Sequence, residues 1–111
     1  MNLEPRPPRK TPTHQVREEP AIVAAFNAQA LAAGTSISEA LLQLIRHYNA
    51  HPRRLKPRPR CGAKTACWGV YFPRSEDERA WAHFQLQAAD RGLRGAEALR
   101  RCVRDFLEGQ G

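Results

Sequence analysis

Apolar residues recur at helical spacing in four stretches of this 111-residue chain, and each stretch predicts an amphipathic helix. The first two stretches carry Ile22, Val23, Phe26 and Ala30, then Ala40, Leu41, Leu44, Ile45 and Tyr48. The other two carry Trp81, Phe84 and Ala88, then Ala98, Leu99, Cys102, Val103 and Phe106. Gly34 and Gly92 follow the first and third stretches, where a glycine commonly ends a helix. Cys102, at an apolar position, is expected to be a small buried hydrophobe.

Serine and acidic residues predict where two of these helices begin. Ser36 and Glu39 form a capping box, in which the serine hydroxyl accepts a hydrogen bond from a main-chain N–H three residues later. Ser75, followed by three acidic residues, is expected to cap the third helix. The fourth helix begins near Arg94 and Gly95 without a serine, so the two halves of the chain differ at this helix end.

Two short segments alternate between apolar and other positions, which is the pattern of a half-buried strand. Residues 67–72 show it clearly, and residues 13–17 hold a weaker candidate around Val16. Each half of the chain thus has the order strand–helix–helix. About 40 residues of this kind bury too little apolar surface to fold alone, and a lone strand leaves its main-chain groups unpaired. We therefore expect a mainly α fold in which the two strands pair as a β-ribbon above four packed helices.

The order repeats because the chain resembles itself. Under the shift that aligns residues 18–49 with residues 76–107, which we call the repeat alignment, ten of the 32 aligned positions are identical. Roughly two or three identities are expected by chance for a composition this rich in alanine and arginine. The matches include Phe26 with Phe84 and Gly34 with Gly92. An internal duplication explains this pattern.

Positive charge is concentrated outside the two repeats. The chain holds 18 Lys and Arg against 11 Asp and Glu, a net charge of +7. Residues 1–12 carry +2, residues 13–50 carry −1, residues 51–65 carry +6 and residues 66–111 are neutral. We therefore divide the chain into a disordered basic arm, a first half, a basic Pro-rich linker and a second half, which together form one intertwined domain. The basic excess favours a polyanionic partner, with nucleic acid as the first candidate.

The segment from Gly34 to Tyr48 resembles the second-helix signature of the ribbon–helix–helix superfamily of DNA-binding proteins (Arc/MetJ/CopG-like). Its Gly-x-Ser-x-Ser sequence precedes an apolar helix that ends in an aromatic residue. The second half keeps Gly92 and the apolar pattern but lacks both serines, and its stretch from Phe72 to Gly92 is about one helical turn longer than is usual in that family. Because both halves lie in one chain, the protein is similar to single-chain tandem members, or pseudo-dimers, of conjugation and T-DNA-transfer systems.

The resemblance implies that the protein binds double-stranded DNA through an antiparallel ribbon in the major groove. Outward ribbon side chains contact base edges in that family, and the amino ends of the second helices contact phosphates. If the apolar strand residues face inward, the expected base contacts are Thr13, Gln15 and Arg17 in the first strand and Gly69 and Tyr71 in the second, with Cys67 on the same face. The expected helix-end phosphate contacts are Ser36, Ile37 and Ser38, with Arg94 and Gly95 in the second half.

The linker adds six candidate phosphate contacts, because residues 51–65 contain no acidic residue. They are Arg53, Arg54, Lys56, Arg58, Arg60 and Lys64. Fifteen extended residues span on the order of 45 Å, which lets the first half reach the start of the second strand. If four of these cations bind phosphates, the logarithm of the DNA-binding constant is expected to fall with the logarithm of salt concentration with a slope of about −3.6.

A metal site is one alternative use of the chain. His47, His51, Cys61 and Cys67 could form a four-ligand set, but the Cys-x5-Cys spacing departs from that of structural zinc sites. His47 also fits the last turn of a helix, where positive charge is favourable. We expect no metal and no other cofactor. Glycine-rich phosphate loops, nucleophile elbows and paired carboxylates are absent from the sequence, so we expect a protein that is not an enzyme.

The remaining alternatives concern the cellular role. The sequence has no apolar run of membrane-span length, no secretory signal and no disulfide framework among its three cysteines, so a cytoplasmic, nucleoid- or plasmid-associated protein is expected. The resemblance implies a transcriptional repressor or a relaxosome accessory factor of a mobile element. It would act with further copies of itself or with a DNA-transfer or regulatory protein. A protein-interaction subunit, or an antitoxin, that uses the same fold without independent sequence-specific DNA binding stays open.

Overall fold

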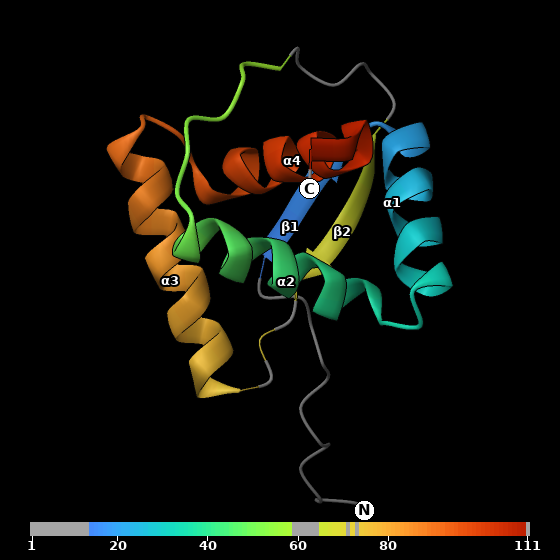
Figure 1. The fold of residues 1–111 in the computed structure, drawn as a ribbon, viewed down its shortest axis with the longest axis horizontal. Helices are drawn as coiled ribbons and strands as arrows, with labels where there is room; N and C mark the ends of the chain where they lie inside the picture. The colour runs from blue at the N-terminus through green and yellow to red at the C-terminus, as the bar shows by residue number, and fades with distance from the viewer. Residues whose placement is uncertain (1–13, 59–64, 71, 73, 111) are drawn as a thin grey trace, which may run out of the picture.

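The order of elements is strand–helix–helix, repeated once (Figure 1). A computed structural model of the chain describes residues 14–58, 65–70, 72 and 74–110. The first half comprises β1 (His14–Glu18), α1 (Pro20–Ala32) and α2 (Ile37–Ala50). The second comprises β2 (Ala66–Val70), α3 (Ser75–Asp90) and α4 (Gly95–Asp105), followed by a short π-helical turn, η1 (Phe106–Gln110). The predicted mainly helical fold with four helices and one two-stranded ribbon is confirmed, with strand ends moved by one or two residues.

The two strands form an antiparallel sheet whose centre is the pair of Val16 and Trp68. Gln15 lies opposite Gly69, and Arg17 lies opposite Cys67. Val16 and Trp68 are buried while Gln15, Arg17 and Cys67 are exposed, because successive side chains of a strand point to opposite faces. The predicted inward and outward sets of the described strand residues are therefore confirmed.

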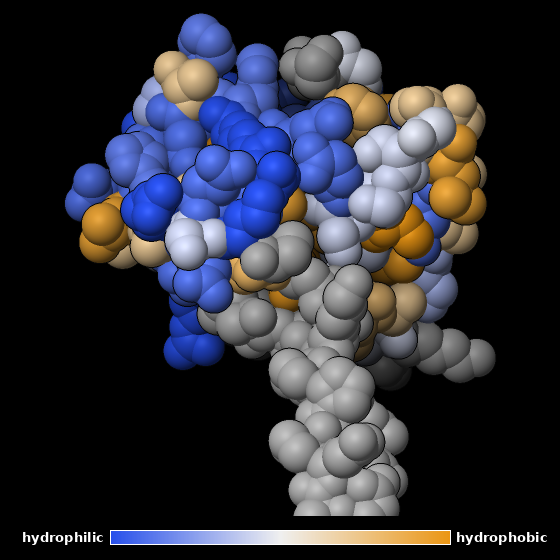
Figure 2. Space-filling view, turned by 90° about the horizontal axis from the view of Figure 1, so that it is seen from below, coloured by the Kyte–Doolittle hydropathy of each residue, from blue (hydrophilic) through white to orange (hydrophobic). Residues whose placement is uncertain are grey.

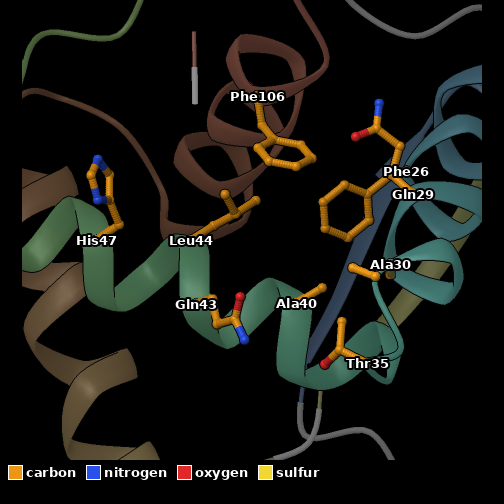
Figure 3. A pocket seen from close by; sticks show the side chains of 10 residues that line it. Phe26, Gln29, Ala30, Thr35, Ala40, Gln43, Leu44, His47 and Phe106 are labelled. Atoms are coloured by element: carbon orange, nitrogen blue, oxygen red, sulfur yellow. The ribbon is translucent and has the colours of Figure 1, made fainter. Parts of the chain in front are cut away.

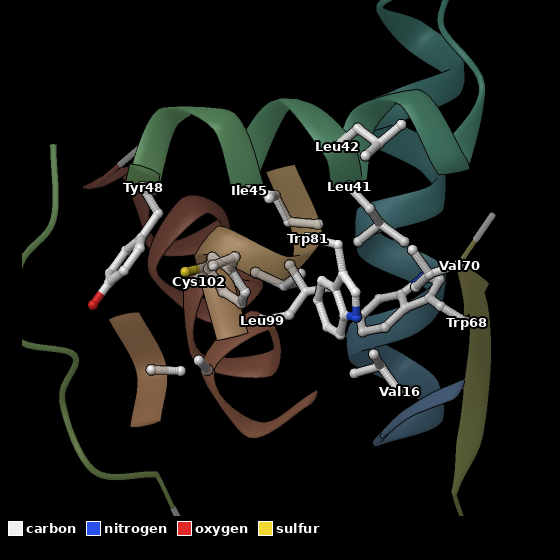
Figure 4. Close-up of a cluster of buried hydrophobic side chains, with 14 of the residues drawn as sticks. Val16, Leu41, Leu42, Ile45, Tyr48, Trp68, Val70, Trp81, Leu99 and Cys102 are labelled. Atoms are coloured by element: carbon white, nitrogen blue, oxygen red, sulfur yellow. The ribbon is translucent and has the colours of Figure 1, made fainter. Parts of the chain in front are cut away.

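α1, α2 and α4 pack on the inward face of the ribbon, and α3 packs against α2 and α4 (Figure 1). The inward strand residues join the apolar stripes of the helices in one hydrophobic cluster, in which Leu41, Ile45 and Leu99 have no exposed surface (Figure 4). The indole N–H of Trp68 donates to the Asn27 side-chain oxygen at 2.9 Å, which gives this large buried ring its polar partner. Cys102 is buried in the same cluster, as predicted.

The helix–turn–helix units of the two halves share their main-chain geometry. Gly34 and Gly92 end α1 and α3 with φ values of 76° and 74°, which an L side chain rarely adopts. The Gly34 N–H donates to the Leu31 carbonyl at 3.0 Å, and the Gly92 N–H donates to the Ala89 carbonyl at 2.9 Å. Leu31 and Ala89 also correspond in the repeat alignment, so these turns repeat in structure as they do in sequence.

Aromatic contacts between the halves follow the same alignment. Phe26 of α1 meets Phe106 at a ring-centroid distance of 5.9 Å, and Phe84 of α3 meets Tyr48 at 5.3 Å. The rings of each pair are inclined by 74°. Because Phe26 corresponds to Phe84 and Tyr48 corresponds to Phe106, the two pairs join equivalent positions of opposite halves, α1 with the turn η1 and α3 with α2.

The difference in residue number that relates the two strands is smaller than the one that relates the helices in the repeat alignment. The ribbon pairs Val16 with Trp68, whereas the repeat alignment of the helices, extended to the strands, would match Val16 with Arg74. The additional residues of the second half lie in a longer connection from Val70 to Ser75 and in a longer first helix, because α3 has 16 residues and α1 has 13. The greater length between Phe72 and Gly92 that the sequence indicates is located here.

One predicted helix cap is wrong. Ser75 is the first residue of α3 rather than its cap, the capping position is held by Arg74, and no side chain caps this end. The acidic residues that follow do not all face solvent, because Asp77 has no exposed surface. Asp77 accepts hydrogen bonds from Arg46 of α2 and from Nε of Arg74, the latter at 3.2 Å. The charge of Asp77 thus joins α2 to α3 in addition to favouring the helix amino end.

Across the described ranges, no single helix has both the length and the apolar composition needed to cross a bilayer, although α1 and α2 together, bent by 95°, have both.

Candidate nucleic-acid interface

The outward face of the ribbon is a polar strip that the helices leave uncovered. It displays Gln15 and Arg17 from β1, with Cys67 and the half-buried Gly69 from β2. Gln15 and Gly69 are directly opposed, as are Arg17 and Cys67, so the long polar side chains of the strip come from β1. Two further predicted base contacts, Thr13 and Tyr71, lie outside the described residues.

Gln15 lies beside the amino end of α4. It shares a shallow hollow of about 490 Å³ with Arg94 and Gly95. The hollow is also lined by Trp81, Gln85, Ala89, Leu93 and Ala96. The structure therefore brings one candidate base contact together with both predicted phosphate contacts of the second half.

The amino ends of α2 and α4 have similar main-chain conformations but different side chains. Ser36 and Arg94 occupy the capping positions, with φ and ψ of −76° and 158° in one and −79° and 153° in the other. The Ser36 hydroxyl accepts a hydrogen bond from the Glu39 N–H at 3.1 Å, which confirms the predicted cap. Arg94 makes no side-chain capping bond, so its exposed guanidinium stands at this end of α4. Ile37 and Ser38 are half-buried in the first turn of α2.

Gly95 is buried where α4 begins against α3. A Cβ atom at this position would lie 2.8 Å from the Gln85 Cγ and 3.1 Å from the Trp81 ring. Gly95 thus lets the two helices approach closely at the end that Arg94 caps. This close approach is a packing role that the sequence pattern did not indicate.

The first part of the linker is bound to the second half rather than free. Leu55 is 4% exposed and belongs to the hydrophobic cluster. The Tyr48 hydroxyl donates to the Arg53 carbonyl at 2.9 Å. Arg53 and Arg58 each donate to the Asp105 carboxylate, at 2.9 Å and 2.7 Å. We call residues 51–58 the strap, because they lie extended across α4 and the turn η1.

Two of the linker cations, Arg53 and Arg58, have acidic partners in the fold. The sequence of the linker has no acid, but the fold brings Asp105 and Glu108 to it. Hydrogen bonds from Arg58 lower the pKa of the Glu108 carboxyl, and hydrogen bonds to Glu108 and Asp105 raise the pKa of Arg58. These two arginines are therefore used in holding the strap.

The other predicted linker contacts are exposed or lie outside the described residues. Arg54 and Lys56 are exposed on the strap. Arg60 and Lys64 fall in the part of the linker that the structure does not describe. Arg54 and Lys56 are thus the described linker cations that a phosphate can reach most directly.

Sequence reasoning missed a second buried carboxylate, Glu18, at the end of β1. Glu18 has no exposed surface and accepts hydrogen bonds from Arg104 at 2.8 and 2.9 Å. The guanidinium of Arg100, itself buried, lies 3.5 Å from the same carboxylate. The repeat contained a signal for this contact, because Arg104 corresponds to Arg46 and both arginines bind a buried acid beside the other half's first helix.

The histidines and cysteines are dispersed. The His47 and His51 rings are 5.3 Å apart, and Cys67 is exposed on the ribbon. Burial raises the pKa of the Cys102 thiol to about 12, which keeps it protonated in the core. Cys61 lies outside the described residues, and the residues that are described hold no group of three or more metal-ligating side chains.

Comparisons of the chain with protein-family models, with curated proteins and with solved structures found no match.

Proposed function

We propose that this protein binds double-stranded DNA as a single-chain pseudo-dimer of the ribbon–helix–helix type. The observation that supports it best is the uncovered outward face of the antiparallel ribbon, which presents Gln15 and Arg17 to solvent. A two-stranded ribbon fits the major groove, and such side chains can read bases there: glutamine bonds the N6 and N7 edge of adenine, and arginine bonds O6 and N7 of guanine.

The second support is that aromatic contacts join equivalent positions of the two halves. α3 of the second half packs on α2 of the first through Phe84 and Tyr48, and α1 of the first half meets the turn η1 of the second through Phe26 and Phe106. A homodimer of strand–helix–helix chains would show the same contacts across its two-fold axis. Here one chain supplies both sets, so the ribbon forms without a second molecule.

Phosphate contacts complete the proposed complex. The amino ends of α2 and α4 offer main-chain N–H groups and the positive end of a helix dipole, and Arg94 adds a charge beside Gln15. The exposed Arg54 and Lys56, with Arg60 and Lys64, supply further phosphate contacts. Phosphate contacts position the protein and the ribbon reads the sequence.

The two strands would read different bases. Val16 and Trp68 are the central residues of the two strands. Gln15 and Cys67 each precede the central residue of their strand, and Arg17 and Gly69 each follow it, so these are the equivalent positions. We therefore expect an asymmetric DNA site rather than a perfect inverted repeat. Selection from a random duplex library tests this directly, and recovery of a clean palindrome would contradict it.

In a cell, such binding suits a cytoplasmic repressor or an accessory factor of DNA transfer on a plasmid or other mobile element. The alternative, an interaction subunit or antitoxin, draws support from α1. This helix contains no charged residue, and its outer surface includes Leu31 at 66% exposure. Apolar surface gathers on the α1 side of the molecule and polar surface on the α3 side (Figure 2). In either case we expect no catalytic activity.

The deciding experiment is a mobility-shift titration on the selected duplex and on random duplex at rising salt. Gln15→Ala and Arg17→Ala should each bring the two affinities closer together by about 5- to 150-fold, the loss of one good base contact. Gln29→Ala on α1 and Arg79→Ala on α3 are matched controls, away from the ribbon, and should leave the ratio unchanged. Failure of the intact protein to select any sequence, with loss of all binding as salt rises, would favour the interaction subunit.

A further inference from the structure

An apolar groove lies between α1 and α2 and is closed at one end by Phe106 (Figure 3). Its volume is about 320 Å³. Phe26, Leu44 and Phe106 point into it from three different elements (Figure 3). The rest of the lining is Gln29, Ala30, Ala33, Thr35, Ala40, Gln43 and His47. The groove is therefore a hollow with an aromatic end and a lining that holds no Lys, Arg, Asp or Glu.

The equivalent place in the second half is covered by the chain itself. In the repeat alignment, the groove residues Leu44 and His47 correspond to Cys102 and Asp105, and Tyr48 takes the place of Phe106. Asp105 and Tyr48 both bind the strap, together with Glu108. Leu55, between the strap residues Arg53 and Arg58 that bind Asp105, is buried in the hydrophobic cluster. One of two related hollows is thus filled by an extended segment that carries a leucine.

The chain contains a second copy of that segment. Leu55 begins the sequence Leu-Lys-Pro-Arg-Pro, and Leu3 begins the sequence Leu-Glu-Pro-Arg-Pro. Leu3 precedes Val16 by as many residues as Leu55 precedes Trp68, and Val16 and Trp68 are the paired strand centres. The two leucines therefore hold equivalent positions ahead of the two strands. The duplication includes the segment in front of each strand.

We propose that the groove between α1 and α2 is the docking site of the chain's own N-terminal segment, with Leu3 as its anchor. Leu3 takes the place in the first half that Leu55 has in the second and covers Phe26, Leu44 and Phe106. From Arg6 to His14 the chain has the same length as from Arg58 to Ala66, about 25 Å when extended, so the reach that serves the strap also serves this segment.

The chemistry of the two sites differs at their rims. Asp105 and Glu108, which hold the strap arginines, correspond to His47 and Ala50 in the first half. The N-terminal segment therefore docks by its leucine without the ion pairs that fix the strap. It is the weaker of the two attachments and opens before the strap does.

Methyl NMR of the full-length protein tests the proposal. With leucine methyl groups labelled, nuclear Overhauser contacts should join the Leu3 methyls to the Phe106 ring, and ring currents should move the Leu3 methyl signals upfield of their disordered positions. Leu3→Asp should shift the Leu44 methyl signals. Leu31→Asp, the same change at an exposed leucine outside the groove, should leave the Leu3 contacts in place.

A second variant tests the groove rather than the segment. Ala33 is exposed at the end of α1 and lines the groove, so Ala33→Trp fills the hollow without removing a core side chain. This variant should return the Leu3 methyl signals to their disordered positions. Disordered Leu3 signals in the unmodified protein, with no contact to Phe106, would overturn the proposal. So would contacts seen only between differently labelled molecules, which would assign the groove to a second copy.

Discussion

Glu18 illustrates how a single charged side chain can connect parts of the chain that are far apart in sequence. It lies 86 residues before Arg104, yet their side chains form two hydrogen bonds inside the fold. Glu18 also accepts from the Glu19 N–H at 2.8 Å, next to the start of α1. A charge buried to this extent is tolerated only because its oxygens are paired and hydrogen-bonded. Glu18 therefore fixes where β1 ends and how α4 lies beneath it.

Glu18→Gln is predicted to destabilise the protein strongly. The substitution keeps the shape of the side chain but leaves the buried guanidinium of Arg100 and that of Arg104 without this negative charge. Breaking one partner of a buried ion pair costs about 3–5 kcal/mol in free energy of unfolding. Urea denaturation followed by circular dichroism measures the loss. Glu78→Gln is the control at an exposed glutamate of α3 and should change stability by less than about 0.5 kcal/mol.

The acid side of the stability profile is predicted to depend on Glu108. Arg58 lowers the pKa of Glu108 in the folded protein, so this carboxyl stabilises the fold above its unfolded pKa of about 4.3. That contribution is lost as pH falls through the lower, folded pKa. Glu108→Gln should therefore flatten the dependence of unfolding free energy on pH in this range. Arg58→Gln should flatten it in the same way, and a double variant that is flatter than both singles would contradict the assignment to this pair.

Among the elements, the strap is the one whose role differs most from that of a simple connection. The sequence predicts a cationic linker with phosphate contacts, and its first residues also form part of the second half's core and ion-pair network. The strap crosses α4 and is held at Tyr48, Asp105 and Glu108. It therefore ties the end of α2 to the end of α4.

Leu55→Ala is predicted to lower the free energy of unfolding by about 2–5 kcal/mol, the usual cost of removing a buried leucine side chain. The reason is that Leu55 is 4% exposed and leaves a cavity under the strap when it is shortened. Leu86→Ala is the matched control, since Leu86 is 68% exposed on α3 and should change stability little. Equal effects of the two substitutions in thermal denaturation would show that the strap leucine does not stabilise the fold.

The elements themselves were predictable, and the contacts that join them were less so. Apolar residues at helical spacing in residues 22–30 and 40–48 predict two helices. Gly34 marks the end of the first helix and Ser36 marks the start of the second, because both signals depend on neighbouring residues alone. Alternation around Trp68 likewise identified the buried face of β2. The pairing of Arg58 with Asp105 spans 47 residues, and no local pattern encodes such a partner. The ribbon's outward set was predictable for the same reason as the core, because the period of a strand fixes both faces at once.

At the scale of the whole molecule, with its net charge of +7, some cations pair with acids of the fold and some are exposed to solvent. Within the described residues, Glu18, Asp77 and Asp105 each bind two arginines, so much of the positive charge on the helices and strap is neutralised inside the fold. Exposed cations stand at the ribbon, at the start of α4 and on the strap, namely Arg17, Arg94, Arg54 and Lys56. Other exposed arginines, Arg46, Arg74, Arg79 and Arg91, lie on or beside α2 and α3. If DNA is the partner, the first four cations set the affinity, and the ribbon sets the sequence preference.

The salt dependence of DNA binding distinguishes exposed linker cations that contact phosphates from linker cations that pair with acids of the fold. Arg53 and Arg58 bind Asp105, so four linker cations are left to contact phosphates. Four such contacts predict a slope of about −3.6 in a plot of log K against log salt concentration. Arg54→Ala combined with Lys56→Ala should make that slope shallower by about 1.8, with little change in stability, because both side chains are exposed. Arg53→Ala combined with Arg58→Ala should instead leave the slope nearly unchanged and lower the unfolding temperature. Fluorescence anisotropy at a series of salt concentrations measures the slopes, and a larger change from the second pair would mean that the strap leaves α4 when DNA binds.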